Sequence, residues 1–211
     1  IVDPELMYSM PKGLTAATGM DALTHAIESY ITPGAWVMSD MFELKAIEMI
    51  AQNLKAAVDN GKDVAAREAM SQAQYIAGMG FSNVGLGIVH SMAHPLGAFY
   101  DTPHGVANAL LLPYVMEYNA ESPAAPKYIH IAKAMGVDTT GMSEAEGVKA
   151  AIEAVKALSI SINIPQKLHE INVKEEDIPA LAVAAYNDVC TGGNPRPTSV
   201  ADIEALYHKA F

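Results

Sequence analysis

The chain has 211 residues, 51% of them hydrophobic, and carries a formal net charge of −11 at pH 7. This length and apolar content suit one large globular domain, and the acidic balance argues against binding to nucleic acid or to anionic membrane surfaces. A single cysteine excludes an internal disulfide, and neither a membrane-spanning run nor a signal peptide is recognisable. We therefore expect a cytoplasmic protein.

The first 80 residues predict three helices. Apolar residues recur every three to four positions from 11 to 31, which indicates a helix that breaks near Gly19 and stops at Pro33-Gly34. Asp40 and Glu43 have capping-box spacing and predict a helix over 40–60. A third helix is expected over about 64–80, followed by the glycine-rich sequence FSNVGLG.

Residues 85–119 hold three of the seven histidines. His90 and His94 are four positions apart, so a helix over 87–96 would present both imidazoles on one face. Thr102 and Pro103 are typical of an N-cap and a first helical residue, which places His104 in the opening turn of the next helix. We expect His104 to face the earlier pair across the intervening loop.

The remaining sequence also reads as helical, with no convincing strand after residue 5. Expected elements are a segment at 126–135, a helix from the Ser143/Glu146 capping box to 158, a turn at 165–170, a helix over 179–190 and a last helix capped by Thr198 or Ser199. The isolated His130, His169 and His208 are interpreted as solvated surface residues. The predicted fold class is all-α.

Asp21 and His25 are also four positions apart on an apolar helix. One carboxylate with two or three imidazoles is a common ligand set for a catalytic Zn(II) or Fe(II) ion. Two hydrolase classes are excluded, because His90 is followed by Ser91 rather than the glutamate of a zincin helix, and no His-Asp dipeptide occurs. Each spacing alone is unspecific; together, polar residues on apolar helices favour a metal site.

Three segments carry a family resemblance: AATGMDALTHAIESYIT, AGMGFSNVGLGIVHSMAHPLGAFYDTPHGVANALLLP and DVCTGGNPRP. In order and spacing they resemble the iron-containing (group III) alcohol dehydrogenases. The GFSNVGLG and CTGGNPR wording is most similar to the lactaldehyde (1,2-propanediol) reductase branch. The resemblance implies the helical C-terminal domain of the dehydroquinate synthase-like fold.

The resemblance also implies a site. Its metal ligands are Asp21, His25, His90 and His104, with Fe(II) favoured and Zn(II) as the alternative. His94 corresponds to a histidine near nicotinamide and substrate, and we expect it to transfer the alcohol proton. Phe81 becomes a candidate pocket residue, and the loop after Cys190 borders the substrate region, although Cys190 itself reads as a small packed residue.

The implied activity is NAD(P)(H)-dependent interconversion of a small alcohol or diol and its aldehyde by a homo-oligomeric enzyme. No glycine-rich nucleotide-binding turn follows a strand here, and the opening residues 1–5 read like the end of a strand. We therefore expect 1–211 to form one helical metal-binding domain, with NAD(P) held by an α/β domain outside this chain. Rival interpretations are a zinc-dependent glycerol dehydrogenase-like or dehydroquinate synthase-like enzyme, and a non-catalytic helical metal-binding module.

Overall fold

The computed structural model describes residues 1–211, and it confirms the all-α fold. Five short 3-10 helices connect or precede the α-helices, and no strand is present. The α-helices are α1 (Lys12–Ile31), α2 (Val37–Asp59), α3 (Val64–Val84), α4 (Ile88–Tyr100), α5 (His104–Asn119), α6 (Tyr128–Ala134), α7 (Glu144–Ser161), α8 (Ile178–Tyr186) and α9 (Val200–Ala210).

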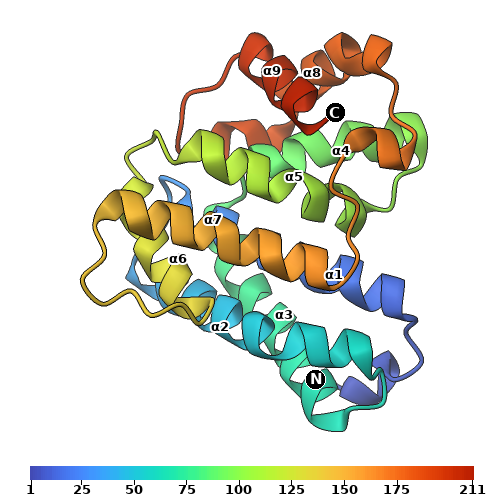
Figure 1. Cartoon of the computed structure of the whole chain (residues 1–211), viewed down its shortest axis with the longest axis vertical. Helices are drawn as coiled ribbons and strands as arrows, with labels where there is room; N and C mark the ends of the chain where they lie inside the picture. Colours follow the sequence, from blue (N-terminus) through green and yellow to red (C-terminus); the bar gives the residue numbers. More distant parts are fainter.

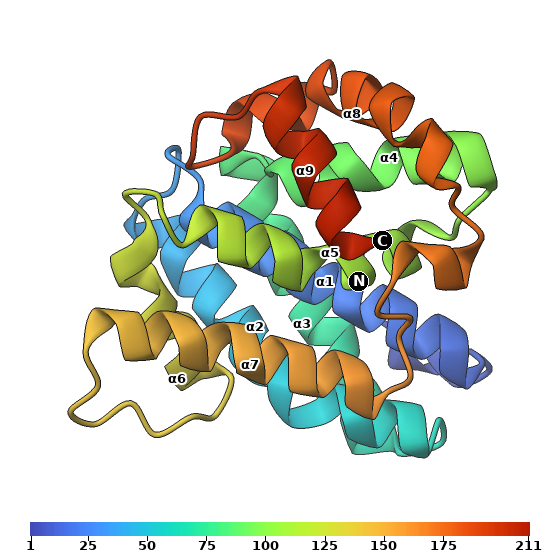
Figure 2. The ribbon, with the colours of Figure 1, turned by 45° about the horizontal axis from the view of Figure 1, so that its top comes forward.

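Helix α1 runs through the middle of the molecule (Figures 1 and 2). It packs against α2 and α3 on one side and against α5 on the other. Helix α4 lies on α5 and α8, α8 pairs with α9, and α6 pairs with α7. Helix α1 is far from α4 and α5 in sequence but close to them in the fold. The helices that carry the predicted ligands therefore lie next to one another.

The core is a single cluster of 49 buried hydrophobic residues. None of the helices is both long enough and apolar enough to cross a lipid bilayer. A few charged or titratable side chains are nevertheless almost completely buried, among them Glu28, Glu43, Arg67 and His90. Burying such a group costs free energy unless it is paired. The partners of these four side chains therefore indicate where a functional site could lie.

Two predictions for the first helices are wrong. Helix α1 runs unbroken through Gly19. The glycine instead allows α2 to approach closely, because a side chain there would collide with Leu54. Helix α2 begins at Val37, and its first turn is closed by the Ser39 hydroxyl, which accepts a hydrogen bond from the Trp36 N–H. Asp40 does not cap α2. It pairs instead with Lys127 of the segment before α6.

Other element boundaries shift by a few residues. Helix α3 continues to Val84, so Phe81 lies within it, and α8 ends at Tyr186, which leaves Cys190 in the 3-10 helix Val189–Gly193. Pro103, not Thr102, is the N-cap of α5, and His104 is its first residue. The Ser143/Glu146 capping box of α7 and the Ser199 cap of α9 are confirmed.

Candidate functional site

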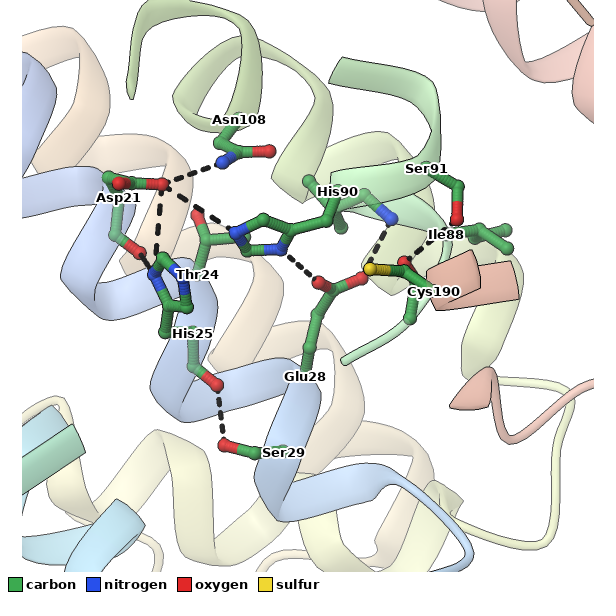
Figure 3. A network of polar contacts seen from close by, with 12 residues as sticks. Asp21, Thr24, His25, Glu28, Ser29, Ile88, His90, Ser91, Asn108 and Cys190 are labelled. Carbon is green, nitrogen blue, oxygen red and sulfur yellow. Dashed lines mark hydrogen bonds and ion pairs between the residues drawn. The ribbon is translucent and has the colours of Figure 1, made fainter. Parts of the chain in front are cut away.

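The Asp21 carboxylate lies among three histidines, two of which, His25 and His90, are labelled beside it in Figure 3. Its Oδ1 is 3.7 Å from His25 Nδ1, 3.7 Å from His90 Nε2 and 3.5 Å from His104 Nε2. Helix α1 supplies Asp21 and His25 one turn apart, α4 supplies His90, and the first turn of α5 supplies His104. The structure thus brings together all four residues predicted as metal ligands.

The four residues are not equally poised. Ligand atoms of Asp21, His90 and His104 all lie within 4.8 Å of one another. His25 stands slightly apart: its Nδ1 is 2.8 Å from the Asp21 carbonyl oxygen, to which it donates when protonated there, and its ring centroid is 4.3 Å from that of His90. His25 Nε2 would then carry the lone pair.

The free nitrogen of His90 tests whether a metal ion fits. His90 Nε2 is buried without a hydrogen-bond partner, while Nδ1 is 2.5 Å from Glu28 Oε2. When Nδ1–H donates to the Glu28 carboxylate, Nε2 of the neutral ring holds a lone pair facing the Asp21 oxygen. Two acceptors so placed repel each other unless Nε2 is protonated or a metal cation lies between them. A carboxylate with three imidazoles suits Fe(II) or Zn(II), so the residues present fit such an ion.

The electrostatics keep two of the imidazoles available as ligands. Burial, together with the neighbouring His90, lowers the pKa of His25, and burial lowers the pKa of His104. Both are therefore neutral near pH 7, as metal ligation requires. Burial also disfavours the charged form of His90, but the hydrogen bond and charge of Glu28 outweigh it and raise its pKa. The carboxylate thereby makes the free Nε2 of His90 a stronger electron-pair donor toward a metal ion.

Asn108, one turn after His104 on α5, completes the cluster. Its Nδ2 donates to Asp21 Oδ1 at 2.6 Å and lies 3.0 Å from His104 Nε2, whereas its buried Oδ1 has no partner. A buried amide so placed holds the Asp21 carboxylate in one orientation. Sequence reasoning missed this residue, although its spacing of four from His104 was a local signal.

His94 belongs to a second, more exposed group. Its ring stacks on His104 with 5.4 Å between centroids, and its Nδ1 is 2.7 Å from Asp188 Oδ2. Asp188 Oδ1 accepts the N–H of Cys190, and burial together with Asp188 raises the pKa of that thiol to about 12. Cys190 is thus protonated near pH 7 and poorly suited to act as a nucleophile. The sequence around His94 does not indicate that Asp188, 94 positions later, is its partner.

Phe81 borders a cavity of about 380 Å³ that also touches Asp21 and His25. The Phe81 ring centroid is 4.5 Å from that of His25. From there the cavity continues between α1 and α3 past Thr18 and toward Arg67. Cys190 does not line it. An aromatic ring beside the ligand cluster at one end of a cavity can limit the size of what enters.

Comparison with known proteins gives concordant findings. The profile of the Fe-containing alcohol dehydrogenase family, C-terminal part, matches residues 15–211. Over 210 residues the chain is 59% identical to lactaldehyde reductase of Escherichia coli (strain K12), covering 100% of this chain and 54% of that protein. It is 47% identical to 1,3-propanediol dehydrogenase of Klebsiella pneumoniae, again over 100% of this chain and 54% of the relative.

The fold agrees with these sequence relatives. A crystal structure of 1,3-propanediol oxidoreductase superimposes with a TM-score of 0.97 at 47% identity, covering 99% of this chain and 55% of the other. The chain therefore spans about half the length of the relatives that it matches. The family profile, the level of identity and the shared fold together establish that the chain belongs to the Fe-containing alcohol dehydrogenase family and corresponds to its C-terminal part.

Proposed function

We propose that this chain is the metal-binding part of an NAD(P)-dependent alcohol dehydrogenase that interconverts a small alcohol or diol and its aldehyde. The observation that carries the proposal is the orphaned, buried Nε2 of His90, which faces Asp21 in a cluster of four predicted ligands. The lactaldehyde/1,2-propanediol type of substrate is favoured by the identity to lactaldehyde reductase.

In this proposal Asp21, His25, His90 and His104 hold one divalent ion, with Fe(II) favoured and Zn(II) as the alternative. A bound ion supplies Lewis acidity toward the substrate oxygen. His94 exchanges the alcohol proton with solvent at Nε2, because its Nδ1 is held by Asp188 and its side chain is 41% exposed. Phe81 closes the substrate end of the cavity and favours short carbon chains.

We further propose that a separate α/β domain outside these 211 residues holds NAD(P), and that the complete enzyme is a homo-oligomer. The cofactor assignment is supported by the relatives' length, about twice that of this chain, and by the name of the NAD-dependent methanol dehydrogenase of Bacillus methanolicus, which is 45% identical. Hydride transfer needs nicotinamide within about 3–3.5 Å of the reacting carbon, which demands a nucleotide site of its own.

The direct test of the ligand assignment is metal titration of this chain. We expect near-unit stoichiometry with Zn(II), or with Fe(II) under anaerobic conditions, and loss of binding in His90→Ala and His104→Ala. Unchanged binding in both variants would refute the ligand assignment.

The division of labour between two domains has its own test. The 211 residues with metal and NAD(P)H should not reduce small aldehydes at a measurable rate, whereas a protein that also carries the proposed nucleotide domain should. Robust turnover by the chain alone would place a nucleotide site within it. Metal binding without turnover in the longer protein would favour the non-catalytic module.

A further inference from the structure

Glu28 is a buried carboxylate with both oxygens engaged. It lies one turn after His25 on α1, and its side chain is 2% exposed. Oε1 accepts the backbone N–H of Val89 at 2.7 Å, and Oε2 is 2.5 Å from His90 Nδ1. Figure 3 shows the carboxylate between the imidazole and the first turn of α4. One side chain of α1 thereby contacts both the backbone of α4 and its metal-facing histidine.

The surroundings select for a carboxylate at this position. The Val89 N–H can only donate, and a bare Nε2 on a neutral His90 requires that Nδ1 donate as well. A carboxylate accepts on both sides, whereas a glutamine would turn an NH₂ donor toward one of them. The backbone also makes room, because a side-chain carbon at Gly87 would lie 2.9 Å from Glu28 Oε1.

We propose that Glu28 is a positioning residue for the metal centre. It holds the proton of neutral His90 on Nδ1 and fixes the ring, so that the Nε2 lone pair faces Asp21 and receives the ion. A carboxylate that accepts a hydrogen bond from the second ring nitrogen of a ligating histidine typically contributes about 10- to 100-fold to metal affinity. This inference rests on the proposed metal site, and it adds a residue that does not itself touch the ion.

The first experiment compares two glutamine variants by calorimetric titration of the metal-free protein with Zn(II). Glu28→Gln keeps the size of the side chain and should weaken binding by about 10- to 100-fold. Glu43→Gln is the matched control, since Glu43 is equally buried but neither of its oxygens has a hydrogen-bond partner. The control should bind Zn(II) as the wild type does. Wild-type affinity in a folded Glu28→Gln variant would overturn the inference.

The second experiment reads the tautomer directly, which a purely structural role for Glu28 would not change. Nitrogen NMR of histidine-labelled, metal-free protein, at a pH above the imidazole titration range, should show His90 protonated on Nδ1 and bare on Nε2. In Glu28→Gln the proton should move to Nε2. A wild-type spectrum with the proton on Nε2 would overturn the inference even if the variant does not fold.

The two proposals fail in different ways. If wild type and Glu28→Gln bind the metal equally while His90→Ala does not, the metal centre stands and the role of Glu28 is refuted. If the wild type binds no divalent ion, the proposed function is refuted, and with it any contribution of Glu28 to metal affinity.

Discussion

Helix α4 carries two histidines one turn apart, and each is paired with a carboxylate from another segment. The two pairs differ in their exposure to water. His90 meets Glu28 of α1 at 2.5 Å, with both side chains 2% exposed. His94 meets Asp188 at 2.7 Å, with side-chain exposures of 41% and 17%. In each pair the carboxylate faces Nδ1, which leaves Nε2 free for other chemistry.

Exposure alone does not separate the roles of the two pairs, since the proposed ligand His104 is itself 44% exposed. The distinguishing feature is what the free nitrogen faces, because the buried Nε2 of His90 lies 3.7 Å from Asp21 Oδ1. A bare nitrogen shielded from water and aimed at a second acceptor is suited to hold a cation, because water cannot satisfy it. A bare nitrogen near the surface can exchange a proton with solvent. We therefore propose that the buried pair serves the metal and the exposed pair serves proton transfer.

Replacing each of the two α4 histidines with alanine should give the largest difference between the two pairs. His90→Ala should lose both the ion and turnover, because it removes the proposed ligand whose free nitrogen is buried. His94→Ala in the complete enzyme should retain its metal but lose turnover by roughly 10²- to 10⁴-fold, as expected for a proton-transfer group. Metal analysis of both purified variants, together with kcat, gives the answer; an ion missing from His94→Ala would make His94 a ligand.

Substitution of Asp188 should have a smaller effect in the same direction. In Asp188→Asn the amide can offer its NH₂ to His94 Nδ1, which moves the imidazole proton toward Nε2. We expect kcat to fall by about 10- to 10³-fold, less than in His94→Ala, with metal affinity unchanged. Asp138→Asn, in the exposed loop before α7, serves as the control. A simultaneous loss of metal would show that the exposed pair also supports the ion.

Phe81 tests the cavity beside the two pairs. Phe81→Ala should raise kcat/KM for bulkier aldehydes relative to short ones by about tenfold, the scale of one pocket contact. Ring packing on His25 makes metal content the necessary control. A ratio of specificity constants equal to that of the wild type would return Phe81 to a packing role.

Glu43 is another buried carboxylate, and neither of its oxygens accepts a hydrogen bond in the structure. Burial raises its pKa from an ordinary 4.5 to about 8, so between these values the folded state keeps a proton that the unfolded state releases. The free energy of unfolding should therefore fall as pH rises through this window, by about 1.4 kcal/mol per pH unit at most. In denaturant titrations at several pH values, the free energy of unfolding of Glu43→Gln should lack this contribution to the pH dependence. Parallel profiles for wild type and variant would show that Glu43 is ionised in the fold.

Much of this protein follows from local sequence signals. The 3.6-residue periodicity predicts the helices, and the Ser143/Glu146 capping box marks the start of α7, because these preferences act within one or two turns. The spacing of four between Asp21 and His25, and again between His90 and His94, places each pair on one helix face. The loop between the two helices also predicts that His104 faces His90 and His94. That Asp21 and His25 join these histidines in one metal site was implied by the family resemblance.

Only the tertiary structure decides what each of these residues does. His90 and His94 have the same residue type on the same helix, yet their partners lie 62 and 94 positions away, on α1 and beside the last 3-10 helix. Gly19 reads as a helix breaker until Leu54 of α2 packs against it. Glu43 reads as part of a capping box until α2 begins at Val37 and places its carboxylate against Gly80 of α3. Burial and hydrogen bonding arise from contacts between distant segments, and these long-range terms outweigh the local preferences of single residues.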